Sequence, residues 1–477
     1  MHPTGHWSAA AGGRNPRRGS TGGSRAGVLT LAVLLVALST VRASPLLEAT
    51  HQDDTPAALQ LLAAGADATG ANRYGSTPLS VACTNGNAEV IAALLGAGAD
   101  PNKPVNGDRT PLMTAARTGK IPPVRLLLEA GAAVGATDRG GQTALMWAAA
   151  DGHAGVVRLL LERGADPNKT LKSGFAPLHF AAREGHREVL GVLLGAGVDP
   201  DVALETDRRG RNLPLPRTSS LVFAIENGHF DLAVDLLDAG ADPNDARTGH
   251  APLHILTWVR KPNRGDDEDG MPPPGGSGRR TSLDLVRALV EHGAEVDLQL
   301  EDGSTGGHRL GSKGATSFLY AAKTADLPLL QLLLELGADP HLPNADGTTP
   351  LMAAAGQGTN APTEEAGTED ECLQAVAFLL TLDADLDTVD KNGETAMHGA
   401  AYKSLPEMVR YLDAQGADIE VWNRKNKRGW TPLVIAQGFR PGNFKPSPET
   451  VEAISEVMLA HGITPPPPPE RTEKKGY

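Results

Sequence analysis

The chain repeats itself with a period of 33 residues, and this repetition constrains its fold more than any other feature of the sequence. The motif TPLSVAC, which starts at Thr77, is echoed at 33-residue intervals by TPLMTAA, TALMWAA and APLHFAA. Copies of the motif start at Ser44, Thr77, Thr110, Thr143, Ala176, Ser219, Ala251, Thr316, Thr349, Thr395 and Thr431. A repeat of this length is typical of an array of small units, in which each unit packs only against its neighbours.

The start of each unit predicts a short helix. In the last copy Thr431 can cap the helix N-terminus, and Pro432 fits the first helical position because that position needs no N–H partner. Alanine pairs such as Ala148-Ala149 follow within about two turns of helix. Small side chains at these places let the helices of adjacent units approach closely.

A second helix is predicted after a tight turn such as Gly152-His153. The apolar residues between Val156 and Leu161 have helical spacing. The helix then ends at a glycine such as Gly164, which suits a left-handed C-terminal position. In the ninth unit Asp383 occupies this place, and aspartate tolerates the conformation less well than glycine. We therefore expect a weaker joint there.

The period and the motif resemble those of the ankyrin repeat family, whose signature is T-P-L-H-x-A every 33 residues. A second motif, GAD, recurs in step at Gly65, Gly98, Gly164, Gly240, Gly337 and Gly416. The resemblance covers residues 44–464. It implies an all-α fold, an ankyrin-repeat solenoid of about eleven helix-turn-helix repeats joined by hairpin-like turns.

The period lengthens at several places, which indicates insertions of two kinds. Residues 201–216 and 299–314 fall in the hairpins between consecutive units, whereas residues 260–280, 356–370 and 438–448 fall between the two helices of one unit. The resemblance implies that hairpins overhang a concave face and that helix–helix turns point away from it. The acid-, proline- and glycine-rich insertion at 260–280 is therefore expected to be a mobile loop pointing away from that face.

The first 43 residues have the order of a secretory signal. They contain five arginines and no acidic residue, then an apolar run from Ala26 to Leu38 and small residues at Val41 and Ala43. We expect cleavage after Ala43. The alternative is an uncleaved membrane anchor, although the run is shorter than the roughly 20 residues of a spanning helix. A signal before ankyrin-like repeats, with alanine-, glycine- and arginine-rich usage, suggests a bacterial protein that is periplasmic or extracellular.

The charge balance argues against some partners. Removal of the five arginines of the signal changes the formal net charge from −13 to −18, and an acidic chain disfavours nucleic acid and anionic membrane surfaces. The segment 465–477 begins with five prolines and is expected to form a flexible, extended tail.

Candidate catalytic or metal-binding residues have structural alternatives. His179, His254 and His398 occupy the histidine place of the motif, which the resemblance assigns to a hydrogen bond with the turn. A second set, His153, His186 and His229, is spaced one unit apart. Helices of adjacent units lie about 8–10 Å apart, too far for one metal ion with bonds of about 2 Å.

The remaining candidate residues also predict no catalytic or metal-binding site. Cys83 occupies an alanine place of the motif and is expected to be a small core residue. Cys372 lies at the start of a second helix seven units away, so the two cannot form a disulfide in this fold. The acidic run 266–269 lacks the alternating ligands and closing glutamate of a calcium loop. No hydrolase, zinc-protease or phosphate-loop motif is present. The sequence therefore predicts no catalytic residue, no metal and no cofactor.

The favoured function is binding of a partner protein, because the resemblance implies that hairpin tips and the first-helix face hold partners. Most tips carry Lys or Arg, so a positive stripe could attract an acidic protein surface; the alternative is that these are solvated turn residues. The predicted contact residues are Arg73, Tyr74, Arg139, Lys172, Phe175, Arg183, Arg247, His250, Trp258, Tyr402 and Trp430.

Within this set the preferred patch comprises Phe175, Arg183 and Trp258, because exposed aromatic and arginine side chains are the usual anchors of interfaces. Trp258 could instead pack under the loop that follows it. We expect a monomer that does not insert into a membrane after signal cleavage. Two alternatives are a structural or surface-attached array without a specific partner, and an enzyme or metal-binding protein.

Overall fold

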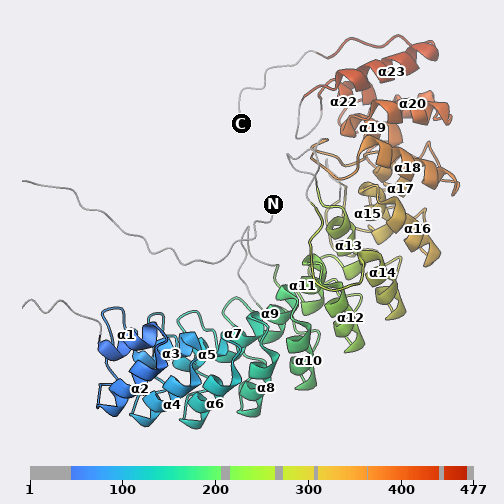
Figure 1. Cartoon of the computed structure of the whole chain (residues 1–477). Helices are drawn as coiled ribbons and strands as arrows, with labels where there is room; N and C mark the ends of the chain where they lie inside the picture. Colours follow the sequence, from blue (N-terminus) through green and yellow to red (C-terminus); the bar gives the residue numbers. More distant parts are fainter. Residues whose placement is uncertain are drawn as a thin grey trace, which may run out of the picture. The chain divides into compact units, whose positions relative to one another are not determined.

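The computed structural model describes residues 44–205, 215–263, 272–305, 310–362, 364–439 and 445–469 (Figure 1). The predicted signal at 1–43, the acidic run at 266–269 and the end of the tail at 470–477 lie outside the described residues. Within these ranges every regular element is a helix, apart from two isolated bridges, Val105–Arg109 and Ala203–Ser219.

The chain divides into two compact units, the first of which ends at Asp100. It contains two helix pairs, each made of a first and a second helix of one repeat. The pairs are α1 (Pro45–His51) with α2 (Thr55–Ala63), and α3 (Pro78–Asn85) with α4 (Ala88–Gly96).

The second unit, from Pro101 onward, contains nine further pairs in the described ranges. Their first helices are α5 (Pro111–Ala116), α7 (Ala144–Ala150), α9 (Pro177–Glu184), α11 (Ser220–Glu226), α13 (Pro252–Arg260), α15 (Ser317–Lys323), α17 (Pro350–Ala354), α19 (Ala396–Lys403) and α22 (Pro432–Ala436). Their second helices are α6 (Ile121–Glu129), α8 (Ala154–Glu162), α10 (Arg187–Gly195), α12 (Phe230–Asp238), α14 (Ser282–Glu291), α16 (Leu327–Glu335), α18 (Glu369–Leu380), α20 (Pro406–Ala414) and α23 (Pro448–Ala460). One short helix, α21 (Ile419–Trp422), lies between α20 and α22. The predicted solenoid of helix pairs is confirmed.

The motif starts the first helix of each repeat by capping it. Thr143 Oγ1 accepts a hydrogen bond of 3.2 Å from the backbone N–H of Met146, and this satisfies one N–H that the helix itself cannot. In α9 an alanine replaces the threonine, and His179 Nδ1 accepts from the Ala176 N–H at 3.0 Å instead. The motif histidine and the motif threonine thus both accept a backbone hydrogen bond at the N-terminus of the first helix.

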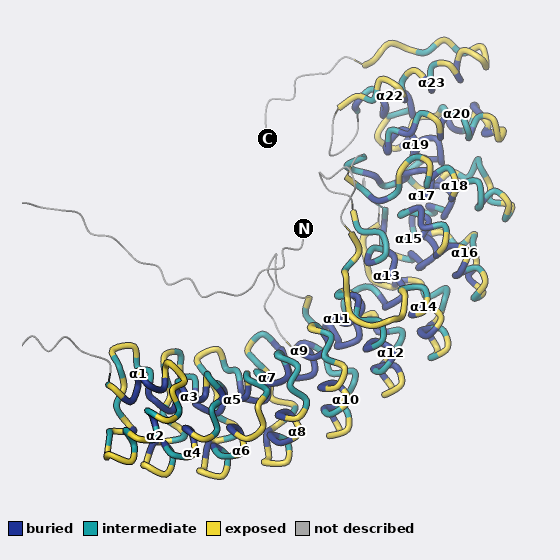
Figure 2. The backbone as a smooth tube through the Cα atoms, in the orientation of Figure 1, coloured by how far each residue is buried: buried dark blue, intermediate teal, exposed yellow. Residues whose placement is uncertain are grey.

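The core runs between the helix layers and consists of alanine and aliphatic residues (Figure 2). The alanine pair Ala148-Ala149 is fully buried, as are Val156 and Leu160 on the second helix of the same repeat. Such a layer is stable only as part of a stack, because one helix pair exposes too much of its apolar face. Asp383 has a φ of 59°, so it does occupy the left-handed position expected for it.

The second histidine set links consecutive repeats of the second unit. The Nε2 atom of His153 lies 2.8 Å from the carbonyl oxygen of Arg117, and His186 and His229 make the same bond to Ala150 and Arg183 at 2.9 and 3.0 Å. These imidazoles are therefore structural hydrogen-bond donors between repeats.

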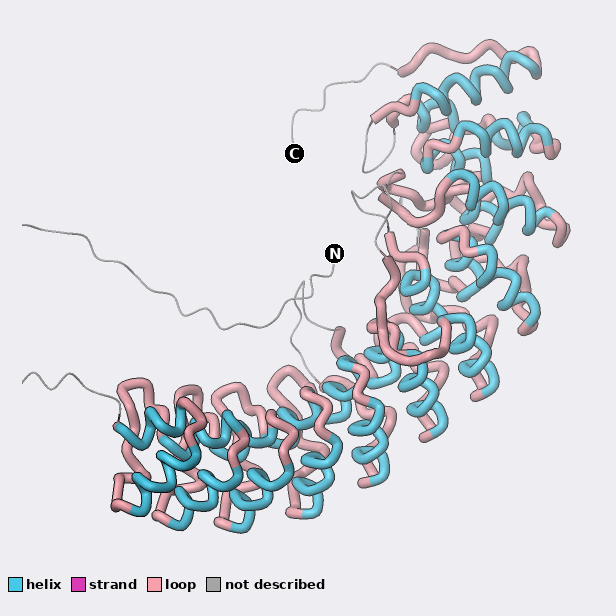
Figure 3. The backbone as a smooth tube through the Cα atoms, viewed as in Figure 1, coloured by secondary structure: helices cyan, strands magenta, loops and turns pink. Residues whose placement is uncertain are grey.

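The insertion at 260–280 is not free of the array (Figure 3). In its described part, Ser277 N donates to His229 Nδ1 at 3.0 Å, and Arg279 N donates to an Asp231 carboxylate oxygen at 2.7 Å. The expectation of a mobile loop pointing away from the concave face stays a prediction for the rest of the insertion. Ser277 and Arg279 are held on the array, because the His229 imidazole and the Asp231 carboxylate accept hydrogen bonds from their backbone.

The insertion at 356–370 also differs from expectation. Helix α17 ends after five residues, and the chain turns at Gly356, whose φ is 110°. Gln357 then donates to Glu394 at the base of a hairpin, and a Cβ at Gly358 would lie 2.4 Å from the Leu310 backbone nitrogen. The expectation that this insertion points away from the hairpins is wrong, because the short helix lets the chain fold back over it.

Candidate partner-binding surface

The basic residues predicted at the hairpin tips are exposed, but their surroundings differ. Lys172 is exposed and forms no ion pair with any described residue. Arg139 lies 3.6 Å from the exposed Asp108, a pair that solvent screens strongly. Arg247 lies 2.7 Å from the buried Asp245 and also donates to the Asp201 carbonyl oxygen at 3.1 Å. Arg247 therefore serves the hairpin itself, whereas Lys172 is available to a partner.

Phe175 and Arg183 are brought together, although not as a fully exposed pair. The Phe175 side chain is only 7% exposed and packs against Phe180 and Phe223 at ring distances of 5.2 and 5.4 Å. The half-buried Arg183 guanidinium lies 5.3 Å from the Phe175 ring and forms an ion pair with Glu184 at 2.7 Å. The expectation that Phe175 is an exposed anchor is wrong, because the next repeat contributes an aromatic residue that covers it.

Trp258 belongs to a separate aromatic cluster. Its ring lies 5.0 Å from that of His250 and 6.3 Å from that of Tyr320, both in edge-to-face arrangements. All three side chains are half-buried, so the cluster combines packing with an accessible edge. Trp258 thus packs on the hairpin before it and on the next repeat, and the structure does not join it to Phe175 and Arg183.

Sequence reasoning missed the aromatic place that precedes the alanine pair. Counted from each motif start, the fifth residue is Trp147, Phe180, Phe223 or Tyr320 in four repeats. Trp147 is half-buried, and two guanidinium groups lie near its ring, that of Arg117 at 4.7 Å and that of Arg109 at 6.0 Å from the ring centre. The fixed position in the motif was the signal that could have revealed these residues.

Two other arginine–aromatic pairs are found at tips. Arg73 stacks on the ring of Tyr74, which is 57% exposed, and donates to its hydroxyl oxygen. Arg428 lies 5.5 Å from the ring of the half-buried Trp430. Arginine over an aromatic face is a common element of binding surfaces.

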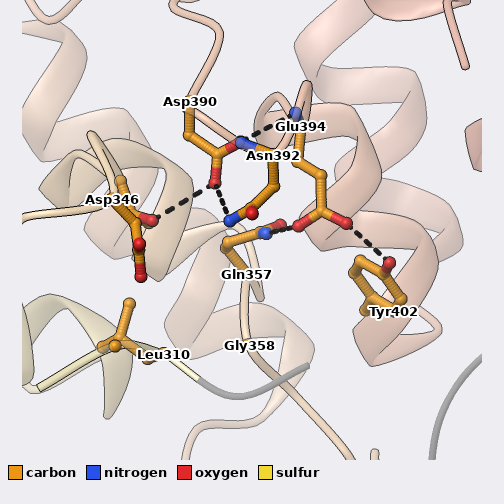
Figure 4. Close-up of a pocket in the computed structure, with 10 residues that line it drawn as sticks. Leu310, Asp346, Gln357, Gly358, Asp390, Asn392, Glu394 and Tyr402 are labelled. Atoms are coloured by element: carbon orange, nitrogen blue, oxygen red, sulfur yellow. Dashed lines mark hydrogen bonds between the residues drawn. The ribbon is translucent and has the colours of Figure 1, made fainter. Parts of the chain in front are cut away.

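Tyr402 is not a surface residue but part of a buried polar network (Figure 4). Its side chain is 5% exposed, and its hydroxyl donates to Glu394 Oε1 at 2.7 Å. Asn426 donates to the same oxygen at 2.8 Å, and Gln357 donates to the other carboxylate oxygen. Burial raises the pKa of Glu394, and burial together with Glu394 raises that of Tyr402. The prediction that Tyr402 faces the groove is wrong, because this carboxylate holds its hydroxyl inside.

The motif histidines lie in the core, as the resemblance implied. His179, His254 and His398 are fully buried, and burial lowers the pKa of each to about 4. They are neutral at pH 7, and the Nε2 atoms of His179 and His254 donate to the carbonyl oxygens of Val202 and Ala315 at 3.1 and 3.2 Å. Cys83 and Cys372 are buried free thiols. In the described part of the chain no group of three or more His, Cys, Asp or Glu residues is arranged to bind a metal ion.

Comparison with known families agrees with this architecture. The family model "Ankyrin repeats (3 copies)" matches residues 28–105, 46–138, 112–204 and 365–445, and the model "Ankyrin repeats (many copies)" matches residues 318–362. The chain belongs to the ankyrin repeat family. Ankyrin repeats generally mediate protein–protein interaction, and proteins built from them are typically non-enzymatic.

Several curated ankyrin repeat proteins are similar to parts of the chain. Human ankyrin repeat and SOCS box protein 6 is 35% identical over 201 residues, which are 39% of this chain and 42% of that protein. Human SH3 and multiple ankyrin repeat domains protein 2 is 28% identical over 185 residues, 34% of this chain and 9% of that protein. The chain thus matches less than half of the length of either relative.

The crystal structure of the human ASB11 ankyrin repeat domain covers 56% of this chain and 100% of its own, with a TM-score of 0.42 and 23% identity. None of the helices in the described ranges is both long and apolar enough to cross a bilayer.

Proposed function

We propose that this ankyrin array is a non-enzymatic scaffold that binds a partner protein through its hairpin tips and first-helix face. The observation that carries the proposal is a set of exposed basic side chains at several tips of the second unit, together with half-buried aromatic residues on the first helices. An acidic protein surface is the partner chemistry that fits such a set.

The charge distribution supports this choice. Lys172, Lys313 and Lys427 are exposed and form no ion pair with described residues, while the whole chain carries a formal net charge of −13. Positive charge at these tips therefore contrasts with an acidic background. Trp147 and Trp258 supply aromatic surface of the kind that dominates binding energy at interfaces.

The test compares two double charge reversals of equal size. One variant carries Lys172→Glu and Lys313→Glu at the tips, and the matched control carries Arg125→Glu and Arg158→Glu, exposed positions on the second helices α6 and α8. The partner is first captured by cross-linking to the tagged full-length chain in its own cells and then purified.

The association rate of that partner is measured with each variant at low and high salt. We expect the tip variant alone to associate more slowly at low salt, with a difference that shrinks as salt screens the charges. Equal rates for both variants would contradict binding through the tips. Failure to capture any partner would favour the alternative of a structural array.

We also infer that residues 1–43 direct export to the periplasm or the cell exterior of a bacterium, because basic residues precede an apolar run and small residues follow it. N-terminal sequencing of the chain purified from its own cells should find Ser44 first. A chain that starts at Met1 in the membrane fraction would instead support a retained anchor.

A further inference from the structure

A buried thiol and a buried amine meet between the ninth and tenth repeats. Cys372, in the first turn of α18, and Lys403, the last residue of α19, are 0% and 3% exposed. The Lys403 Nζ atom lies 3.4 Å from the Cys372 sulfur and also donates to the Ala366 carbonyl oxygen at 2.5 Å. The carbonyl bond fixes the amine beside the sulfur, so the two groups remain in contact without intervening solvent.

A second amine and a carboxylate lie beside this pair. A second buried amine, Lys323, lies 3.0 Å from Glu365 and donates to Thr359 Oγ1 at 2.7 Å. The cluster thus holds two amines and one carboxylate. It is electrically balanced when Cys372 is a thiolate or when one amine is neutral. A thiolate is the form of cysteine that peroxide oxidises, and a neutral amine is a nucleophile.

We propose that Cys372 and Lys403 form a covalent N–S cross-link when the protein is exposed to hydrogen peroxide. The thiolate attacks peroxide, the O–O bond breaks, and the products are a sulfenic acid and hydroxide, so that sulfur is oxidised and peroxide is reduced. The hydroxide takes a proton from the Lys403 ammonium and becomes water. The neutral amine then attacks the sulfur, an N–S bond forms, the S–OH bond breaks, and the amine proton leaves with the hydroxyl group as a second water.

The fold determines how peroxide reaches the Cys372 sulfur and what the cross-link holds in place. The cluster lies against two residues of the insertion, through the bonds of Lys323 to Thr359 and of Lys403 to Ala366. Peroxide therefore reaches the sulfur when this segment opens locally. The cross-link would join α18 to the end of α19 and fix the insertion over the groups that it covers.

The experiment treats the purified full-length chain with hydrogen peroxide and analyses its proteolytic peptides by mass spectrometry. We expect one linked peptide pair containing Cys372 and Lys403, lighter than the two separate peptides by two hydrogens, which an added thiol reduces to the free peptides. Cys83 is an internal control, because it is equally buried and burial raises the pKa of its thiol. We expect Cys83 to stay unmodified.

The variant Lys403→Arg keeps the positive charge but offers a guanidinium in place of the amine. In this variant we expect the sulfenic acid of Cys372 to persist and to be trapped by dimedone, whereas the wild-type chain gives the linked pair and little trapped product. Circular dichroism checks that the variant is folded. Absence of the linked pair from the wild-type chain overturns the proposal whether or not the variant folds, as does equal dimedone trapping in both chains.

Discussion

Protonation of the buried motif histidines should destabilise the array in mild acid, and His179 allows the effect to be isolated. Its Nδ1 atom accepts from the Ala176 N–H, and its Nε2 atom donates to the Val202 carbonyl oxygen at 3.1 Å. A proton on Nδ1 would remove the first bond and place a charge in the core. Burial lowers the pKa of His179 to about 4, although the bond to Val202 acts in the opposite direction.

The sign and size of the effect follow from this shift. An unfolded chain binds a proton at the ordinary histidine value of 6.5, so between pH 6.5 and 4 it holds more protons than the folded chain, and stability is lost as the pH falls through this window. One pKa unit corresponds to about 1.4 kcal/mol. At pH 5 the loss from His179 is therefore about 2 kcal/mol, and its limit is about 3.4 kcal/mol.

The assay is urea unfolding at pH 7.5 and pH 5.0, with the wild-type chain and the variant His179→Gln. We expect the wild type to lose about 2 kcal/mol more than the variant between the two pH values. The control is His341→Gln, at an exposed position, which should keep the wild-type pH dependence. Buried carboxylates such as Glu394, whose pKa burial raises, act in the opposite direction but cancel in the comparison. An equal loss in wild type and His179→Gln would refute the reasoning.

Four further variants test the packing. Glu394→Ala removes the shared acceptor of three buried hydrogen bonds, from Tyr402, Asn426 and Gln357, and should lower the free energy of unfolding by about 3 kcal/mol, whereas an unchanged urea midpoint would show that the network contributes little. Phe175→Ala should cost about 3–5 kcal/mol and Lys172→Glu less than about 0.5 kcal/mol in the same assay; similar costs would contradict their assigned burial. Deletion of residues 263–278 should keep the helical circular dichroism signal and cost about 1 kcal/mol, because the bonds of Ser277 to His229 are lost; loss of the helical signal would show a larger role.

The repeat period predicted most of the fold, because an array depends on contacts between neighbours that recur in the sequence. The helix starts, the alanine core and the structural role of His179 all follow from positions in the motif. The course of the insertions could not be predicted in the same way. The return of Gln357 to Glu394 depends on a helix that ends two residues before Gly356, and the repeat consensus predicts a longer helix there.

The candidate site was harder to predict than the fold. Tip residues such as Lys172 were assigned from their register, but exposure of an aromatic residue depends on its neighbour in the next repeat. Phe223 covers Phe175, and Tyr320 packs beside Trp258. A single copy of the motif gives no information on such pairs, so the burial of Phe175 was not predicted. The burial of Tyr402 was not predicted either, because it depends on the hydrogen bond to Glu394.

The bond between repeats made by His153, His186 and His229 also restricts how this protein can change during evolution. Each ring lies where a side chain of the preceding repeat would begin; a Cβ at Gly152, for example, would be 2.7 Å from His186 Nδ1. The histidine can be lost first without a clash, but the glycine cannot gain a side chain while the histidine remains. The present sequence agrees with this restriction. Ala325 and Ser404 occupy the glycine place, and the repeats after them begin their second helices from Thr368 and Ser447 in place of histidine.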